Sequence, residues 1–153
     1  MEGIMKVENI MVRDVRSILP DIPIGQATEE LFRYKISGLP VIDKDGKLVG
    51  MFTEKDILRY VLPGYLKQVG SFVYQDDPKI IGSKVKELLR DKKVRDVMRE
   101  QVVTVGPQAS LSEVARTMLT EKVRRIPVVD KQNKVIGIIA REDVVKAFMK
   151  AES

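Results

Sequence analysis

Two short apolar stretches, Gly38–Asp43 (GLPVID) and Arg125–Asp130 (RIPVVD), occur 87 residues apart in this 153-residue chain. Each surrounds a proline with aliphatic residues and ends at an aspartate. Short apolar runs of this kind are typical of buried β-strands. Their recurrence predicts that the chain contains the same folding unit twice.

The repeat extends far beyond these two strands. At the same shift of 87 residues, positions 7–62 align with positions 94–149 without a gap, and twelve residues are identical. We therefore divide the chain into a first repeat (1–62), an inter-repeat segment (63–93) and a second repeat (94–153). The identical residues of the first repeat are Val7, Met11, Val15, Pro20, Lys35, Pro40, Val41, Asp43, Lys44, Lys47, Gly50 and Asp56.

Each repeat is predicted to have the order strand, helix, strand, strand, helix. In the second repeat a β-branched run at 102–105 precedes Ser110, which with Glu113 forms a capping box that opens a helix. The two apolar strands are followed by turns at Gly46 and Asn133, residue types that tolerate positive φ. The predicted apolar helix faces are Leu111, Val114, Met118 and Leu119 in the second repeat, and Ile24, Ala27, Leu31 and Phe32 in the first.

The final helix of each repeat is expected to end at about Leu62 or Met149. The segment 63–93 is too long for a plain loop. Asp77-Pro78 has the form of an N-cap followed by proline at the first helical position, so we expect an additional helix near 78–90. Residues 64–77 give no readable pattern.

The fold class that follows is α+β, with two β-α-β-β-α repeats. A single repeat of this size would leave one apolar sheet face exposed. Packing two repeats sheet against sheet about a pseudo-twofold axis would bury both faces, so we expect that arrangement.

Composition excludes several kinds of function. The chain has no Cys, His or Trp, which removes disulfides, thiolate nucleophiles and the commonest general base and metal ligand. We nominate no catalytic and no metal-binding residue. There is neither an apolar run of about 18 residues nor a signal-peptide pattern at the N-terminus, so a cytoplasmic location is expected, without a membrane segment. The net charge of +5 suits an anionic ligand.

The repeat resembles the CBS domain, and the tandem resembles a CBS pair, or Bateman module. Three motifs carry the resemblance: V-x-x-I/V-M at 7–11 and 94–98, the L/I-P-V strand of each repeat, and G-x-x-T-x-x-D at 50–56. It implies that the chain binds an adenosine ligand in clefts between the repeats, with AMP, ADP or ATP expected first. It also implies a homodimer that regulates a partner enzyme or transporter, with no cofactor required.

The resemblance assigns roles to the residues of the T-x-x-D motif. Asp56 would bind the ribose hydroxyls, and Thr53 would lie near ribose or phosphate. A capping box at the start of a helix explains the same two residues without a ligand. The second repeat keeps Asp143 but has Ala140 in place of the threonine, which puts a second site in doubt. There Arg141 is a candidate phosphate ligand or a solvated helix residue.

Basic residues precede the second L/I-P-V strand but not the first. Arg124 and Arg125 correspond to Ser37 and Gly38 in the first repeat. We interpret the two arginines as a phosphate clamp for a ligand held by Thr53 and Asp56, because arginine forks match phosphate oxygens. An ordinary basic surface is the alternative, and it is the interpretation that we prefer for Lys122.

Adenine would need an apolar slot, for which Ile18, Leu39 and Pro40 are candidates by position, although each could simply belong to the core. S-adenosylmethionine and cyclic dinucleotides are alternative ligands. A structural or dimerisation module with an empty cleft is the alternative function. A nucleic-acid binder is suggested by the pI of about 9.4. It is disfavoured because aromatic residues make up 5% of the chain and no nucleic-acid-binding motif is present.

Overall fold

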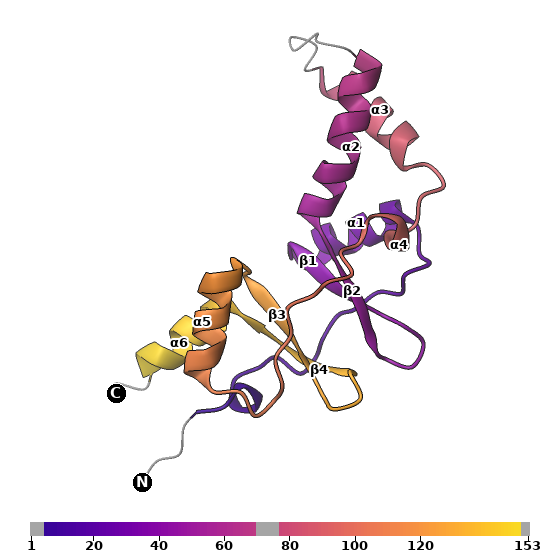
Figure 1. Cartoon of the computed structure of the whole chain (residues 1–153). Helices are drawn as coiled ribbons and strands as arrows, with labels where there is room; N and C mark the ends of the chain where they lie inside the picture. The colour runs from indigo at the N-terminus through magenta and orange to yellow at the C-terminus, as the bar shows by residue number, and fades with distance from the viewer. Residues whose placement is uncertain (1–4, 70–76, 151–153) are drawn as a thin grey trace. The chain divides into compact units, whose positions relative to one another are not determined.

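The computed structural model describes residues 5–69 and 77–150, which form two compact units (Figure 1). The first unit comprises Met1–Ser17, Ile42–Val49 and Gln101–Ser153, and the second comprises Ile18–Val41 and Gly50–Glu100. Each unit therefore combines segments from both sequence repeats. The mixture of helices with small two-stranded sheets confirms the predicted α+β class.

The second unit is built around one helix and most of one β-hairpin. Its elements are α1 (Ile24–Tyr34), β1 (Gly38–Ile42), β2 (Leu48–Thr53), α2 (Glu54–Val69), α3 (Pro78–Leu89) and α4 (Val94–Val97), although residues 42–49 at the hairpin tip belong to the first unit. Helices α2 and α3 pack side by side (Figure 1). Ile24, Leu31 and Phe52 are among its fully buried side chains, so the core lies between the hairpin and α1.

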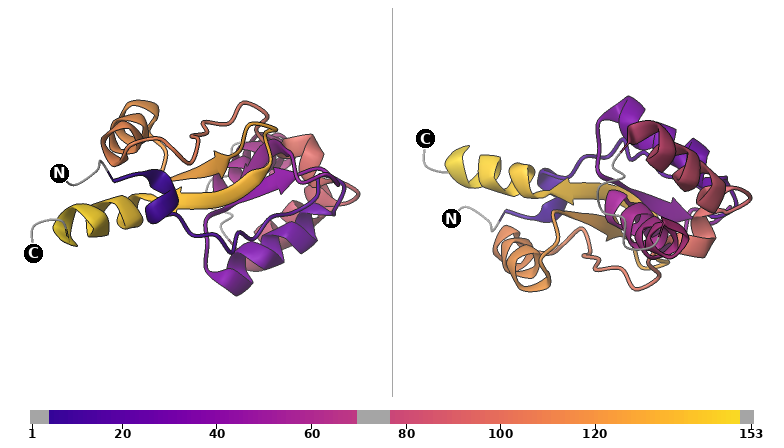
Figure 2. Two further views of the ribbon diagram at one scale, coloured as in Figure 1. Left: turned by 90° about the horizontal axis from the view of Figure 1, so that it is seen from below. Right: turned by 90° about the horizontal axis from the view of Figure 1, so that it is seen from above.

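The first unit contains the corresponding elements of the second repeat. These are α5 (Leu111–Glu121), β3 (Arg125–Val129), β4 (Val135–Ala140) and α6 (Arg141–Lys150), together with the short 3-10 helix η1 (Val7–Asn9). Strands β3 and β4 are antiparallel, and Figure 2 shows α6 continuing from the end of β4. The buried core of this unit is Val7, Met11, Leu111, Val114, Met118, Ile126, Val128, Ile139, Val144 and Ala147.

Prolines reduce the first predicted strand of the second repeat to a single parallel bridge. The amide of Val105 donates to the carbonyl of Pro127 (3.2 Å), and the amide of Val129 donates to the carbonyl of Val105 (3.0 Å). Continuing the ladder in either direction would need an amide hydrogen on Pro107 or on Pro127, and proline has none. The strand is therefore correctly placed by the sequence but cannot lengthen.

The first repeat has the same restriction. Ile18 forms a parallel bridge with Val41, and its amide donates to the carbonyl of Pro40 (3.0 Å). Pro20 and Pro40 occupy the positions whose amides the next rungs would require. This gives a structural reason why both prolines recur in the two repeats.

A methionine lies against a strand glycine in each unit. A Cβ on Gly50 would fall 2.8 Å from the sulfur of Met98 and 2.8 Å from the carbonyl oxygen of Arg99. In the first unit, the Met11 thioether fills the space that a Cβ on Gly137 would need. Met98 follows α4, from the second repeat, whereas Gly50 belongs to the first. The sequence repeats and the compact units are thus different divisions of the chain.

The segments that carry Met11 and Met98 each pack in the unit that holds most of the other repeat, and we call them the methionine segments. Backbone hydrogen bonds hold them in place. Val12 and Ile138 donate to each other's carbonyl groups, both at 2.9 Å, in the first unit. Met51 and Arg99 do the same in the second unit, also at 2.9 Å. Each methionine segment therefore adds a short antiparallel bridge to a hairpin of the other repeat.

Local signals in the sequence are confirmed at the turns and at the added helix. Gly46 and Asn133 have positive φ angles of 83° and 66°. Helix α3 begins at Pro78, and the side chain of Asp77 accepts a hydrogen bond from the amide of Lys79 (2.9 Å). Of the unreadable stretch 64–77, residues 64–69 are helical, and 70–76 lie outside the described residues.

The prediction that α2 ends at about Leu62 is wrong, because the helix continues through Pro63 to Val69. Proline removes one backbone hydrogen bond from a helix. The packing of α2 beside α3 provides tertiary contacts that a sequence pattern does not reveal.

The predicted helix faces are correct at three of their four positions. The hydroxyl of Ser110 accepts from the amide of Glu113 (3.2 Å), as expected for the N-cap of α5. However, Phe32 and Leu119 are 69% and 76% exposed. At about 100° per residue, position i+8 lies about 80° from position i, at the edge of the buried stripe. Positions i, i+3 and i+7 fill the core without it.

Candidate functional site

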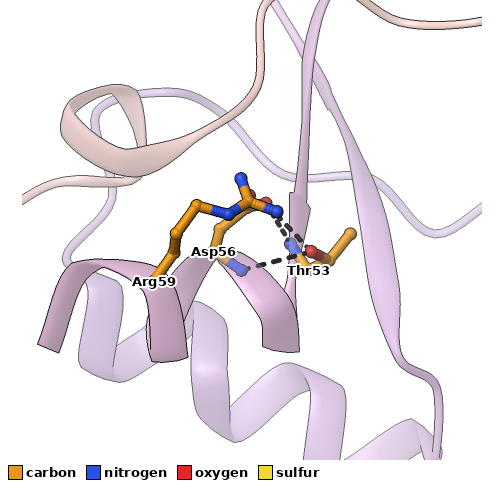
Figure 3. A network of polar contacts seen from close by, with 3 residues as sticks. All are labelled: Thr53, Asp56 and Arg59. Carbon is orange, nitrogen blue, oxygen red and sulfur yellow. Dashed lines mark hydrogen bonds and ion pairs between the residues drawn. The ribbon is translucent and has the colours of Figure 1, made fainter. Parts of the chain in front are cut away.

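The T-x-x-D motif forms a compact polar cluster at the junction of β2 and α2 (Figure 3). Asp56 Oδ2 accepts hydrogen bonds from the backbone amide of Thr53 (2.9 Å) and from its hydroxyl (3.0 Å). The amide of Asp56 lies 3.4 Å from the Thr53 hydroxyl oxygen. The predicted capping box is therefore present, and it fixes the carboxylate at the start of the helix.

Arg59 completes this cluster, although it is not among the residues predicted from the sequence. Its Nη1 lies 3.1 Å from Asp56 Oδ1, one helical turn away (Figure 3). The Asp56 side chain has no exposed surface, whereas that of Arg59 is 61% exposed. An acid in the first turn followed three residues later by arginine is a recognised helix pair. That spacing is the signal that could have identified Arg59.

The apolar candidates lie in the same unit as Thr53 and Asp56. Ile18, Leu39 and Pro40 are all buried, and Ile18 is bonded to Pro40 through the backbone. The amide of Glu54, at the start of α2, donates to the carbonyl of Ser37 (3.0 Å), which ties the helix start to the beginning of β1. Burial makes Ile18, Leu39 and Pro40 part of the core, and their contact with adenine stays a prediction.

In the first unit the corresponding helix start also holds its aspartate. Asp143 Oδ2 accepts from the amide of Ala140 (2.8 Å), the bond that Thr53 supplies in the other repeat. Asp143 is partly exposed, in contrast to the buried Asp56. The carboxylate position is therefore kept even where the capping hydroxyl is lost.

Arginines surround this second helix start. Arg125 pairs with Ala140 across the hairpin, and the amide of Arg141 donates to the carbonyl of Arg124 (2.9 Å). The guanidinium of Arg141 also donates to the carbonyl of Val123 (3.4 Å). The structure thus brings the three candidate arginines to the same end of β3–β4 as Asp143.

The proposed clamp combines residues of both units. Arg124 and Arg125 belong to the first unit, whereas Thr53 and Asp56 belong to the second. Their joint action on one ligand stays a prediction. Lys122, which we did not assign to the clamp, is the C-cap of α5, with a left-handed backbone (φ 57°).

The two helix starts also differ in the pair of residues that face each other across the hairpin. A Cβ on Gly38 would lie 2.8 Å from the Thr53 Cγ2 methyl group and 3.3 Å from the carbonyl oxygen of Phe52. The equivalent pair in the second repeat is Arg125 and Ala140. In the first repeat the branched Thr53 at the end of β2 therefore faces a glycine on β1. In the second repeat Ala140 at the end of β4 faces an arginine on β3.

The described residues, 5–69 and 77–150, hold no group of three or more Asp or Glu residues arranged to bind a metal ion. In the same part of the chain, no helix combines the length and the apolar character needed to cross a bilayer.

Comparison with protein families agrees with the sequence repeat. The CBS domain profile matches twice, at residues 7–63 and 94–150. The chain belongs to the CBS domain family, as a tandem pair.

Two relatives illustrate the contexts in which such pairs occur. The inosine-5'-monophosphate dehydrogenase of Methanocaldococcus jannaschii is 32% identical over 146 residues, which cover 95% of this chain but 24% of the dehydrogenase. The chain thus spans about a quarter of that enzyme. An uncharacterized protein of the same organism is 31% identical over 162 residues, covering 95% of this chain and 92% of the relative.

Solved structures of similar fold include ligand complexes. The CBSX2 complex with AMP has a TM-score of 0.74 and 30% identity, and covers 97% of this chain and 98% of that one. The CBS domain pair of a second protein, MJ0100, was solved with 5'-methylthioadenosine and S-adenosyl-L-methionine. Its TM-score is 0.69 at 25% identity, covering 97% of this chain and 99% of that one.

The close contact between Gly38 and the Thr53 methyl group predicts how substitution of Gly38 changes stability. Gly38→Ala should lower the free energy of unfolding by about 1–3 kcal/mol, as overpacking commonly does. Thr53→Ser removes the obstructing methyl group and keeps the hydroxyl, so the glycine substitution should be less destabilising in that background. Denaturant unfolding of the four proteins in a double-mutant cycle measures the coupling. Strictly additive effects would show that the Thr53 methyl group does not dictate glycine.

Proposed function

We propose that this chain is a non-catalytic regulatory module that binds an adenosine nucleotide, with AMP, ADP or ATP as its ligand. The observation that carries the proposal is the pair of carboxylates, Asp56 and Asp143, held at equivalent helix starts. Each carboxylate accepts from the amide three residues before it, with a capping hydroxyl at Thr53 and without one at Ala140. The AMP complex of a similar CBS pair supports the same ligand class.

The chemistry of the two helix starts suits a ribose phosphate. An ionised carboxylate can accept hydrogen bonds from vicinal hydroxyl groups, and this is the role proposed for Asp56. Arginine guanidinium groups match phosphate oxygens, and this is the role proposed for Arg124 and Arg125, with Arg141 as a further candidate. The buried Ile18, Leu39 and Pro40 are the proposed wall for adenine.

Other adenosine ligands fit the same carboxylate. S-adenosylmethionine and 5'-methylthioadenosine also contain adenosine with its vicinal diol, and the MJ0100 complexes support both. A cyclic dinucleotide that contains adenine is a further alternative, in which each ribose offers one free hydroxyl. A ligand without phosphate would make little use of the arginines at 124 and 125. Their presence therefore favours a phosphorylated ligand.

Regulation requires a partner that responds to the bound state. A ligand shifts a conformational equilibrium only if it binds two states with different affinity. We propose that the partner is a separate enzyme or transporter. A purely structural module with an empty cleft is the alternative, and ligand titration decides between them.

A homodimer is proposed as the working form. Large apolar side chains are exposed at equivalent positions of the two repeats: Phe32 and Leu119, Leu58 and Val145, and Leu62 and Met149. These residues lie on helices α1 and α2 of one unit and α5 and α6 of the other. Exposed apolar groups that recur in this way favour association with a second copy.

The ribose assignment predicts an effect of single carboxylate changes. Asp56→Asn keeps the shape but weakens the acceptor, so AMP affinity should fall by about 1.5–3 kcal/mol, the scale of a hydrogen bond to a charged group. Asp143→Asn should have a smaller effect. Thermal shift across adenosine nucleotides finds the ligand, and calorimetry then ranks the variants. A larger loss for Asp143→Asn would identify the second repeat as the primary site.

The phosphate assignment is tested by comparing two ligands. Arg124→Ala and Arg125→Ala should weaken AMP binding by about 1–3 kcal/mol and adenosine binding much less. Arg125→Lys should give an intermediate affinity, because lysine keeps the charge but loses the planar fork. Calorimetric titration measures both ligands. Equal losses for adenosine and AMP would rule out phosphate contact.

The dimer proposal predicts an effect of charge on an exposed apolar position. Leu119→Glu should weaken self-association by at least about tenfold, as expected for an apolar contact at the centre of an interface. Glu121→Lys, an exposed position on another side of α5, is the matched control. Light scattering over a concentration series measures both. A wild-type chain that stays monomeric throughout would refute the dimer.

A further inference from the structure

The carboxylate proposed to bind ribose is already occupied. Its Oδ2 accepts two hydrogen bonds from Thr53, and its Oδ1 accepts the guanidinium of Arg59 at 3.1 Å (Figure 3). The Asp56 side chain has no exposed surface. A ligand that approaches this helix start therefore does not meet a free acceptor.

The number of acceptor positions limits what can bind. A carboxylate offers about four lone-pair positions, and three protein donors use this one. Two vicinal hydroxyls need two positions, so one donor has to leave. The Thr53 donors are fixed by the backbone and by the capping box. Arg59 is held through a long, flexible and largely exposed side chain, so it is the donor that can leave.

We propose that Arg59 competes with ribose for Asp56, so that a vicinal diol binds the first repeat only by displacing this arginine. The inference rests on the function proposed above. While the ion pair is closed, the carboxylate is not competent to bind a diol, so the apparent affinity is the intrinsic affinity multiplied by the open fraction. Arg59 thereby sets the ligand concentration at which the site fills.

The second repeat provides a built-in comparison. Lys146 occupies the position of Arg59, and it pairs with Glu142 (4.0 Å). Asp143 accepts from the amide of Ala140 and is partly exposed. The two helix starts therefore differ in how their carboxylates are covered, and Lys146 is the matched control position.

Adenosine is the appropriate probe, because it carries the diol without a phosphate. Amide NMR signals of Thr53 and Asp56 in the full chain report binding at the first repeat, and those of Ala140 and Asp143 report the second. Arg59→Gln should tighten adenosine binding at the first repeat by about three- to tenfold, the inverse of the open fraction. Lys146→Gln should leave the affinity at both repeats unchanged.

Two further measurements separate displacement from indirect effects. 2'-Deoxyadenosine has one hydroxyl of the pair and can use the remaining lone-pair position, so it should gain nothing from Arg59→Gln. Arg59→Lys keeps a cation near Asp56, so its affinity for adenosine should lie between those of the wild type and Arg59→Gln. Arg59 is largely exposed, so the variants are expected to fold, and thermal unfolding verifies this.

The outcomes distinguish this inference from the function on which it rests. If wild-type protein binds adenosine at the first repeat and Arg59→Gln binds it equally or more weakly, the competition is refuted and the proposed function stands. If the gain extends to 2'-deoxyadenosine, displacement by the diol is refuted. If adenosine and AMP shift none of these amide signals in either protein, the proposed function fails, and the competition fails with it.

Discussion

The contact between a methionine and a strand glycine is the constraint on which both units depend. Met98 can lie on β2 only because Gly50 has no Cβ, and Met11 and Gly137 repeat the arrangement. The close approach lets residues 12 and 99 bond to the neighbouring strand. Since each methionine segment comes from the other sequence repeat, neither unit has its full set of core residues without the exchange. Two of the twelve identical residue pairs have their explanation here.

The helix start that follows β2 serves structure and proposed function with the same atoms. The carboxylate of Asp56 satisfies the amide of Thr53, which a helix start would otherwise leave without a partner. The same bonds hold the carboxylate in one orientation, and a fixed acceptor is what recognition of a diol requires. Arg59 and the two donors of Thr53 together stabilise the buried charge, and the Thr53 donors stay in place when Arg59 moves away.

Duplication has left two helix starts with different chemistry. The first repeat combines a covered carboxylate with glycine, and the second combines a partly exposed carboxylate with arginines. The steric link between Gly38 and Thr53 explains why these features change together. The methyl group of Thr53 excludes a side chain at position 38, whereas Ala140 leaves room for Arg125. The asymmetry is therefore a property of residue pairs.

The sequence by itself determined the duplication, the α+β class, the turns at Gly46 and Asn133 and the cap at Asp77. The turns and the cap depend on residues within a few positions of one another, and the duplication is visible directly as a match of the sequence with itself at a shift of 87 residues. The sequence also identified both candidate carboxylates by their place in the repeat. Only the tertiary structure decided that the methionine segments are exchanged, that α2 passes Pro63 and that Phe32 stays exposed. The first two depend on partners distant in sequence, and the exposure of Phe32 depends on how wide a face of α1 the core covers. The ion pair of Arg59 with Asp56 depends on both levels: its spacing is visible in the sequence, whereas the burial of Asp56 that makes it important is a tertiary feature.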